Sequence, residues 1–509
     1  MRRFATLLAF SIVLSVQGGL GSQPVDGREA ARTYVDRHYR EVLGEFVDLL
    51  KIPNIASNRE DLWKNARVLL DMLTKRGVAA EILEAGGAPF VIGSLDAPQA
   101  QGTLLLYAHY DGQPVDPSRW SGSHPFEPVL RDASLDDGGA VIPLPVVERP
   151  NDDWRLYARS ASDDKAPIGA MLAALDALRA EDIPLTYNLR FIFEGEEEAG
   201  SPNLQEVLKR HGTKLAADAV LVADGPVFLT GEPTLYFGAR GITTLEITVY
   251  GARNPLHSGH YGNWAPNPAM MLAKLLSSMK DSDGRVQVAG FYDGVVPLSP
   301  LERTYLERIP GVEAQLMKDL WIGQPETSAR LVESINLPSL NVRGLNSGWV
   351  GDQARTIIPA SATASLDLRL VHGIDPTVQE DRVINHIRQN GYRVVEEEPD
   401  ATTRAESPKL AVVVRGSGYP AYRSPVELPL CRKMVESMEG AFERVVVLPT
   451  LGGSVPLYLF HKVLGVDAII GVPIVNPDNN QHSPNENLRL GNFFSGIETF
   501  AVLFSTKLE

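Results

Sequence analysis

Residues 102–112 read GTLLLYAHYDG, and this stretch combines a buried strand with polar residues at its end. The apolar run 104–108 is short, continuous and preceded by a glycine, which is typical of a strand buried on both faces. Residues 189–193 and 219–223 have the same character, and the Ala- and Leu-rich residues 168–178 between them predict a helix. Helices that alternate with buried strands predict an α/β fold, with a mostly parallel sheet covered by helices on both faces.

A different pattern begins near Phe237. Residues 243–250 alternate apolar and polar side chains, as expected for a strand with one face in water. The segments that follow predict a helix, two strands, a helix and a strand, at residues 269–279, 339–345, 363–371, 378–389 and 410–414. Strand, helix, two strands, helix, strand is the order of a ferredoxin-like α+β domain.

The chain length supports two domains, because 509 residues exceed what one ordinary core holds. The larger α/β domain is predicted to comprise residues 30–237 and 419–509. The ferredoxin-like domain, residues 238–418, is predicted as an insertion between these two parts. Residues 284–338 carry no pattern that assigns them to either domain.

The first residues have the pattern of a secretory signal peptide, predicted at residues 1–22. Arg2 and Arg3 precede the apolar run 4–16, and small residues follow it. A membrane anchor is the alternative, but the run is shorter than the ~20 residues that span a bilayer. We therefore expect export to the periplasm or secretion, with cleavage between Gly18 and Ser22.

The composition restricts the partners of the mature chain. Hydrophobic residues make up 44% and charged residues 22%, a balance typical of a globular protein, and the formal net charge is -15. An acidic chain is a poor ligand for nucleic acid or anionic membranes, since both attract basic surfaces. We expect no nucleic-acid partner and no membrane association of the mature form. The single cysteine, Cys431, excludes an internal disulfide.

Candidate metal ligands lie at the predicted strand ends and helix starts. Carboxyl ends of parallel strands meet at one edge of an open α/β sheet, so these side chains are expected to converge. Imidazole and carboxylate ligands together suit zinc, with cobalt or manganese as alternatives. The residues are His109, Asp111, Asp163, Asp164, Glu194, Glu196, Glu197, Glu198, Asp224 and His482.

Each of these signals alone has an ordinary structural explanation. A His-x-Asp pair is common on surfaces, and a run of glutamates is usually a solvated face. An aspartate before a helix is usually a cap, and an aspartate after a strand is usually a turn residue. The positional pattern by itself supports a metal site and these ordinary explanations about equally.

The same residues form an ordered set of motifs that resembles a known family. From about Tyr34 to the C-terminus, the chain resembles the two-zinc metallopeptidases that include carnosinase-type dipeptidases, carboxypeptidase G, aminoacylase and succinyl-diaminopimelate desuccinylase. The motifs that carry the resemblance are Tyr107-Ala-His-Tyr-Asp111, Tyr157-Ala-Arg-Ser-Ala-Ser-Asp-Asp-Lys165, Glu194-Gly-Glu-Glu-Glu-Ala-Gly-Ser201, Asp224-Gly225, His257-Ser-Gly259, Gly452-Gly-Ser-Val-Pro456 and His482-Ser-Pro-Asn-Glu486.

The resemblance implies a role for each candidate at the centre. Asp163 would bridge two metal ions, with a cis peptide bond between Asp163 and Asp164. Glu197 would be the general base for a water held between the metals, and Asp111 would orient a ligand histidine. The remaining ligands would be His109 and Asp224 on one ion, and Glu198 and His482 on the other.

The resemblance also makes the larger domain catalytic and the inserted domain a lid that forms a homodimer. His257 of the inserted domain would act in catalysis, often across the dimer. Arg369 would bind the substrate carboxylate, for which a bidentate guanidinium is suited. Gly453 and Ser454 would also contact the substrate.

The implied function is metal-dependent hydrolysis of the amide bond of a dipeptide or short peptide. An N-acyl-amino-acid amidohydrolase with the same metals is the first alternative. Thr450 and Leu451 stand where dipeptidase-like relatives often have Arg-Glu, which puts recognition of a free α-amino group in doubt. The second alternative is an exported binding protein on an inactive hydrolase scaffold, which the loss of a ligand or of Glu197 would favour, but none is lost.

Overall fold

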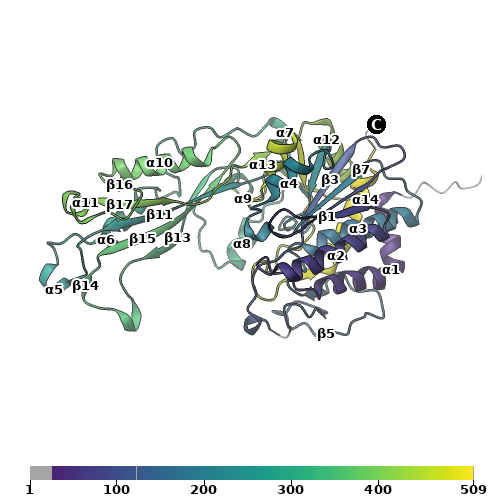
Figure 1. The fold of residues 1–509 in the computed structure, drawn as a ribbon, viewed down its shortest axis with the longest axis horizontal. Helices are drawn as coiled ribbons and strands as arrows, with labels where there is room; N and C mark the ends of the chain where they lie inside the picture. Colours follow the sequence, from purple (N-terminus) through teal and green to yellow (C-terminus); the bar gives the residue numbers. More distant parts are fainter. Residues whose placement is uncertain (1–25, 122, 508–509) are drawn as a thin grey trace, which may run out of the picture.

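The computed structural model describes residues 26–121 and 123–507. The predicted signal peptide lies outside the described residues and stays a prediction. Figure 1 shows a large domain, which holds both ends of the described chain, and an elongated inserted domain beside it. Among the described residues, no helix has the length and apolar character needed to cross a membrane.

The large domain is built on an eight-stranded sheet with the order β1-β2-β7-β3-β8-β20-β9-β19. The central strands β7, β3, β8 and β20 run parallel, and β2 is antiparallel to both of its neighbours. This confirms the predicted α/β fold with a mostly parallel sheet. The strands are β1 (Ala79–Leu83), β2 (Phe90–Leu95), β3 (Thr103–His109), β7 (Asn188–Glu194), β8 (Ala219–Val222), β9 (Thr234–Tyr236), β19 (Val446–Leu448) and β20 (Ala468–Gly471).

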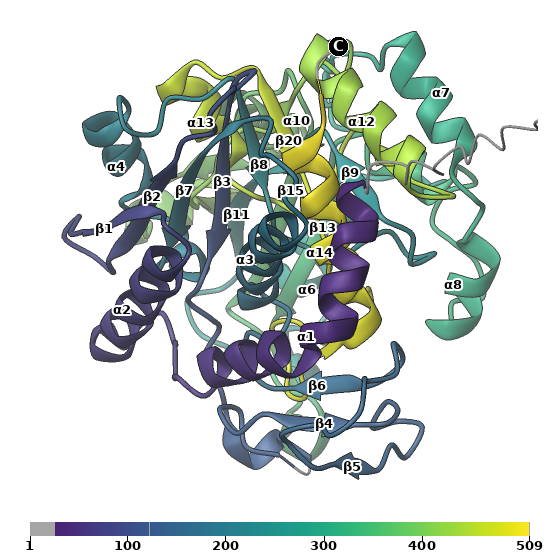
Figure 2. The ribbon, with the colours of Figure 1, turned by 90° about the vertical axis from the view of Figure 1, so that its right-hand side faces the viewer.

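Helices cover both faces of this sheet, as Figure 2 shows. Leu104 and Leu106 of β3 pack in one apolar core, and Leu105 and Tyr107 pack in the other, because successive side chains of a strand point to opposite faces. The first core contains α1 (Gly27–Leu50), α2 (Arg59–Lys75), α3 (Lys165–Ala180), α12 (Pro429–Ala441) and α14 (Leu490–Ser505). The second contains α4 (Leu204–His211) and α13 (Leu457–Leu464).

A small antiparallel sheet, not predicted from the sequence, flanks the large one. Its order is β21-β6-β4-β5. The strands have only two or three residues each, too few to show a period in the sequence. They are β4 (Val129–Arg131), β5 (Val141–Ile142), β6 (Arg155–Tyr157) and β21 (Asn487–Arg489). Strand β21 directly follows the segment that carries His482, so this sheet ties the C-terminal part of the chain to residues 155–157.

The inserted domain has the predicted ferredoxin-like order with one additional strand. Its sheet runs β13-β15-β11-β17-β16, and β16 is the strand that was not predicted. Helices α6 (Pro268–Ser277) and α10 (Pro376–Gln389) pack on the sheet's apolar face. Helix α10 begins earlier than expected because the Asp375 side chain accepts a hydrogen bond from Val378 N and caps it. The strands are β11 (Gly241–Tyr250), β13 (Ser339–Asn346), β15 (Ser361–Leu370), β16 (Arg393–Val395) and β17 (Leu410–Arg415).

Part of the inserted segment packs on the large domain. Residues 284–338 contain α7 (Pro300–Arg308), α8 (Glu313–Asp319) and α9 (Leu331–Ser334). Leu306, Ile309, Val312 and Val332 are buried in the same core as strands β8 and β19. The middle part of the predicted insertion, residues 284–338, therefore returns to the core of the large domain.

The chain leaves the large domain and returns to it at adjacent strands. Strand β10 (Gly238–Ala239) pairs antiparallel with β18 (Tyr422–Arg423). Gly238 has no room for a Cβ, which would lie 2.6 Å from Tyr422 O, so only glycine permits this close approach. This pairing lies close to the predicted domain boundaries at residues 237 and 419.

Candidate metal centre

Three neighbouring strands end at the centre. His109 is the last residue of β3, Glu194 is the last residue of β7, and Asp224 follows β8 by two positions. Strand β3 lies between β7 and β8 and is parallel to both, so their carboxyl ends meet at one edge. Asp163 and Asp164 precede α3. The structure thus gathers the candidates at the predicted edge of the sheet.

The Asp163 carboxylate lies between two histidines from opposite ends of the chain. Its Oδ1 is 3.0 Å from His109 Nε2, and its Oδ2 is 3.1 Å from His482 Nε2. One oxygen therefore faces each imidazole, the arrangement expected of a bridging carboxylate. The peptide bond between Asp163 and Asp164 is cis, as predicted.

The ligand atoms form two groups. Asp163, Glu198 and His482 each offer an atom within 4.8 Å of the others. His109, Asp164 and Asp224 form a second group by the same distance. All five predicted ligands are therefore brought together, and Asp164, a candidate by its position to which the family resemblance gave no ligand role, joins the second group.

The donor atoms fit divalent metal ions. Two ligands bound tetrahedrally to zinc at ~2.0–2.1 Å lie roughly 3.3 Å apart. The distances from Asp163 to the two imidazoles and the 3.5 Å between His482 Nε2 and Glu198 Oε2 are close to that value. Mixed imidazole and carboxylate donors also suit cobalt and manganese, so the donor set does not select one metal.

Asp111 positions the first ligand and the glutamate turn at the same time. Its Oδ1 lies 3.3 Å from His109 Nδ1, leaving Nε2 to face Asp163. The same carboxylate accepts hydrogen bonds from the backbone N–H groups of Glu197 and Glu198, at 3.1 and 3.0 Å. Asp111 is completely buried. It therefore fixes the imidazole of His109 relative to the turn that carries Glu197 and Glu198.

Without cations, the centre crowds several buried carboxylates. Burial raises the pKa of Asp224 to about 6 and that of Glu198 to about 7, and the charge of Asp163 adds to both. Burial also raises the pKa of Glu197. For Asp163, burial is outweighed by hydrogen bonds from His109 and His482, which hold its pKa below the usual value. Such a cluster needs protons or metal ions to neutralise it.

Two predicted substrate contacts meet where the domains join. Arg369 on β15 donates from Nη1 to the Ser454 hydroxyl at 2.8 Å. Gly453, the residue before Ser454, accepts a hydrogen bond at 3.1 Å from the backbone N–H of Arg240. Tyr419 lies beside this pair and was missed by the sequence analysis. Burial raises its pKa, with the charge of Glu197 adding to this effect and the charge of Arg369 opposing it, so its phenol lies within electrostatic range of both residues.

The comparison with known proteins agrees with this geometry. The sequence profile of peptidase family M20/M25/M40 matches residues 105–506. The chain belongs to peptidase family M20/M25/M40. This confirms the family predicted from the motifs and the prediction of a metal-dependent peptidase.

Relatives within the M20 family match this chain over almost its whole length. The human Beta-Ala-His dipeptidase is 25% identical, over 99% of this chain and 97% of that protein. A Cys-Gly metallodipeptidase of Schizosaccharomyces pombe is 26% identical, over 92% and 95% of the two chains. Among solved structures, an M20 family metallo-carboxypeptidase of Sulfolobus solfataricus is 29% identical, with a TM-score of 0.73 over 92% of this chain and 99% of that one.

Of the residues predicted to act in catalysis, His257 lies away from the metal centre. It lies on β12 (Leu256–His257), which pairs with β14 (Ile357–Ile358) and precedes α5 (Ser258–Tyr261). Figure 1 places α5 and β14 at the end of the inserted domain that is farthest from the large domain. The imidazole is exposed, accepts a hydrogen bond from Gly259 N at 3.0 Å, and lies 4.6 Å from the ring of His260.

Two buried acids beneath the ligands were not assigned a role from the sequence. Glu194 accepts a hydrogen bond of 2.8 Å from the Tyr107 hydroxyl, and burial raises its pKa to about 8. Glu486 accepts hydrogen bonds from residues 159–163, among them the backbone N–H of Asp163. Both residues stand in the quoted motifs, but their function depends on contacts between segments that the sequence does not show to be adjacent.

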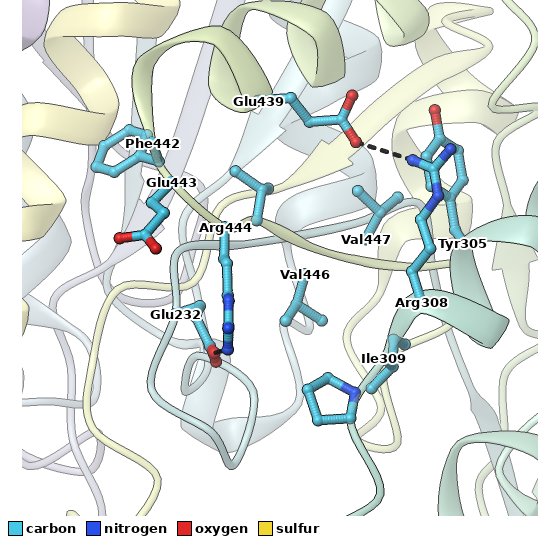
Figure 3. A pocket seen from close by; sticks show the side chains of 12 residues that line it. Glu232, Tyr305, Arg308, Ile309, Glu439, Phe442, Glu443, Arg444, Val446 and Val447 are labelled. Atoms are coloured by element: carbon cyan, nitrogen blue, oxygen red, sulfur yellow. Dashed lines mark hydrogen bonds and ion pairs between the residues drawn. The ribbon is translucent and has the colours of Figure 1, made fainter.

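A pocket of about 380 Å³ lies at the far edge of the large sheet, beside β19. Figure 3 shows its wall, where Arg308 and Glu439 pair at 3.2 Å and Tyr305, Phe442 and Val447 supply apolar surface. None of the candidate site residues lines this pocket. It is therefore separate from the metal centre.

Proposed function

We propose that this chain is a dipeptidase that hydrolyses a peptide bond with two divalent metal ions and with Glu197 as general base. The observation that carries the proposal is the position of the Asp163 carboxylate, with one oxygen facing His109 and the other facing His482. In the proposed assignment, His109 and Asp224 hold one ion, and Glu198 and His482 hold the other. Zinc is the proposed metal, with cobalt or manganese as alternatives.

The names of the relatives support a dipeptide as substrate. The two curated relatives are a Beta-Ala-His dipeptidase and a Cys-Gly metallodipeptidase. Both align with this chain over more than nine-tenths of their lengths. An alignment of that extent includes the metal centre and the inserted domain, which carries the proposed substrate contact Arg369.

The protein's own residues divide the reaction into three tasks. When bound, the two ions would polarise the scissile carbonyl and lower the pKa of a water molecule towards ~7. Glu197 interacts electrostatically with residues of both ligand groups but belongs to neither group. Its carboxylate is therefore free to take a proton from that water. It can then deliver the proton to the leaving amine. Asp111 holds the His109 imidazole and the Glu197 backbone in fixed relative positions during these transfers.

Arg369 and Ser454 are proposed to bind the carboxylate of the substrate. The Arg369 guanidinium is about one-third exposed, and one of its nitrogen atoms is already held by Ser454. Its Nε lies 3.7 Å from Asp367 Oδ1, and its N–H donors on Nη1 and Nη2 can engage a carboxylate in the fork geometry that favours arginine over lysine. The free carboxyl group of a dipeptide meets this requirement.

We also propose a homodimer and export. The exposed His257 lies at the distal end of the inserted domain, away from its own chain's metal centre, which supports a role at the active site of a partner subunit. The apolar run 4–16 after Arg2 and Arg3 supports a cleaved signal peptide. N-terminal sequencing of the mature protein from the producing cell would test the export proposal, which an uncleaved Met1 start would contradict.

One observation favours a second candidate, an N-acyl-amino-acid amidohydrolase. Leu451 lies over Gly225, the residue after the proposed ligand Asp224. A Cβ on Gly225 would be 3.6 Å from Leu451 Cδ2. An apolar side chain at this place suits a neutral acyl group better than a charged α-amino group.

The deciding experiment is hydrolysis of a mixed panel of dipeptides and N-acyl amino acids. The chain would be stripped of metal and assayed with and without zinc, cobalt or manganese, beside Glu197→Gln. We expect activity that metal restores and that the variant lowers about 10²–10⁴-fold while it still binds metal. Cleavage of the N-acyl compounds alone would establish the amidohydrolase. No turnover with any metal would contradict both functions.

A further inference from the structure

The carboxylate of Glu486 is completely buried and accepts four hydrogen bonds from one segment of the chain. Its Oε1 accepts from the backbone N–H groups of Ser162 and Asp163, both at 2.9 Å. Its Oε2 accepts from Ser160 N at 2.9 Å and from Arg159 Nη1 at 2.7 Å. Residues 159–163 therefore surround a single buried carboxylate. Four donors need four acceptor sites, which an ionised carboxylate provides.

The small sheet brings Glu486 to this position. Strand β21 begins at Asn487, and Asn487 pairs with Tyr157, the last residue of β6. The residue before β21 therefore lies beside the residues that follow β6. The Glu486 carbonyl continues this pairing by accepting a hydrogen bond from Ala158 N at 3.2 Å.

Glu486 connects the segments that carry Asp163 and His482. His482 stands four positions before Glu486 in the same loop, and Arg159 reaches back to this loop by donating from Nη2 to Ser483 O at 3.3 Å. Ser160 and His482 both have φ near 60°, a backbone conformation that non-glycine residues adopt only where the surroundings hold it. Glu486 and Arg159 supply these surroundings for both segments.

We propose that Glu486 is a positioning residue that holds Asp163 and His482 at the separation required for metal binding. The inference rests on the proposed metal pair, because Asp163 is the ligand that would serve both ions. The Asp163 backbone is fixed by Glu486 at a point 323 residues away in the sequence. Other links between the two segments are the β6–β21 pairing and the contacts that Arg159 and Ser162 make with Ser483 O and Asn487 O, and none of them involves Asp163.

The test compares metal affinity in wild type and Glu486→Gln by competition with a chelator that reports free zinc. Glutamine keeps the shape but has one oxygen, and its amide N–H groups would face backbone donors. We expect the affinity for zinc to fall about 10–100-fold, the range found for groups that support metal ligands. The unfolding temperature is measured on the metal-free wild type and variant, and the zinc content is measured after zinc has been added back.

The matched control is Glu302→Gln. Glu302 is also buried and also holds an arginine and a backbone N–H, through Arg423 at 3.1 Å and Ser299 at 2.6 Å, but it caps α7 far from the centre. This control should bind zinc as the wild type does. Equal loss of affinity in both variants would show general destabilisation and overturn the inference.

The remaining outcomes separate this inference from the proposed function. A wild type that binds two zinc ions together with Glu486→Gln of unchanged affinity would overturn the inference alone. A wild type that binds none would overturn the proposed function and the inference with it. If Glu486→Gln does not fold, Arg159→Lys is tested in its place, because lysine cannot reach both Glu486 and Ser483. Weaker zinc binding by Arg159→Lys would support the inference, and wild-type affinity would contradict it.

Discussion

Arg369 of the inserted domain donates a hydrogen bond of 2.8 Å to the Ser454 hydroxyl of the large domain. The contact joins β15 to the turn that precedes α13. Both residues were predicted from the sequence to contact the substrate. The Tyr419 phenol lies within electrostatic range of both Arg369 and the general-base candidate Glu197. Substrate binding at Arg369 would therefore connect the two domains beside the metal centre.

Replacing Arg369 by glutamine should raise KM for substrates with a free carboxyl terminus. Loss of a charge-assisted hydrogen bond of ~1.5–3 kcal/mol corresponds to a decrease of about 10–100-fold in kcat/KM. The measurement is steady-state kinetics on a dipeptide and on its C-terminal amide, which should be affected far less. Arg343→Gln is the control, because Arg343 makes a similar 2.9 Å contact with Ser365 on the exposed face of the inserted domain. Equal losses on the acid and the amide would argue against the assigned role.

Substitution of Asp163 should remove more metal ions than substitution of Asp224. Asp163 faces both histidines, so Asp163→Asn weakens both sites, whereas Asp224 belongs to one ligand group and Asp224→Asn weakens one. We expect little retained metal in the first variant and about one ion in the second, a difference set by the shared ligand. Elemental analysis after dialysis measures it. Retention of both ions by Asp163→Asn would contradict the bridging role.

The metal-free protein should lose stability as the pH rises from about 4 to about 7. Unfolded carboxyl groups titrate near ~4, whereas the folded pKa values are about 6 for Asp224 and about 7 for Glu198. The folded state therefore binds more protons in this window, and linkage makes its stability fall with increasing pH. Hydrogen bonds to Asp111 and Asp163 raise the pKa of His109 despite its burial, which has the same sign. Thermal unfolding at pH 5 and pH 7.5 checks this.

The same titration should make metal affinity increase with pH. Metal ions compete with protons for Asp224 and Glu198, so zinc binding should strengthen between pH 5 and pH 7.5 and release protons. Calorimetric titrations in buffers of different ionisation enthalpy measure the protons released. A metal-free protein that is equally stable at both pH values, with no proton release on binding, would contradict the crowding of charge at the centre.

Mixed dimers should show whether His257 serves the partner subunit's site. His257→Ala and Glu197→Gln would each be nearly inactive alone. If His257 acts across a two-fold dimer, co-refolded subunits should recover about a quarter of wild-type activity, since half of the dimers contain one intact site. The measurement is activity of the equimolar mixture beside each variant refolded alone. No recovery, with dimers present by light scattering, would place His257 outside the shared site.

Local patterns in the sequence determined the main elements of the fold. The run at 104–108 is a strand buried on both faces, and the polar residues after it lie at the strand end, because a continuous apolar run requires cover on both sides. The alternation at 243–250 is β11 of the inserted domain. The order of the motifs was also sufficient to predict the family, and the ligand residues they contain lie together in the structure.

The tertiary structure alone decided how these elements are combined. The small sheet and β16 have strands of two or three residues, too short for a detectable period, and they form only where a partner strand is already in place. Helices α7–α9 rejoin the large domain through apolar contacts that the sequence does not show.

The buried contacts at the centre show the same limit. Glu486 and Asp163 are 323 residues apart, and His257 lies at the distal end of its domain despite its motif. The sequence specifies which side chains are available, because strand and helix periods are local properties. The meeting of Asp163 with His109, His482 and Glu486 depends on strand pairing between distant segments, which leaves no local pattern to read.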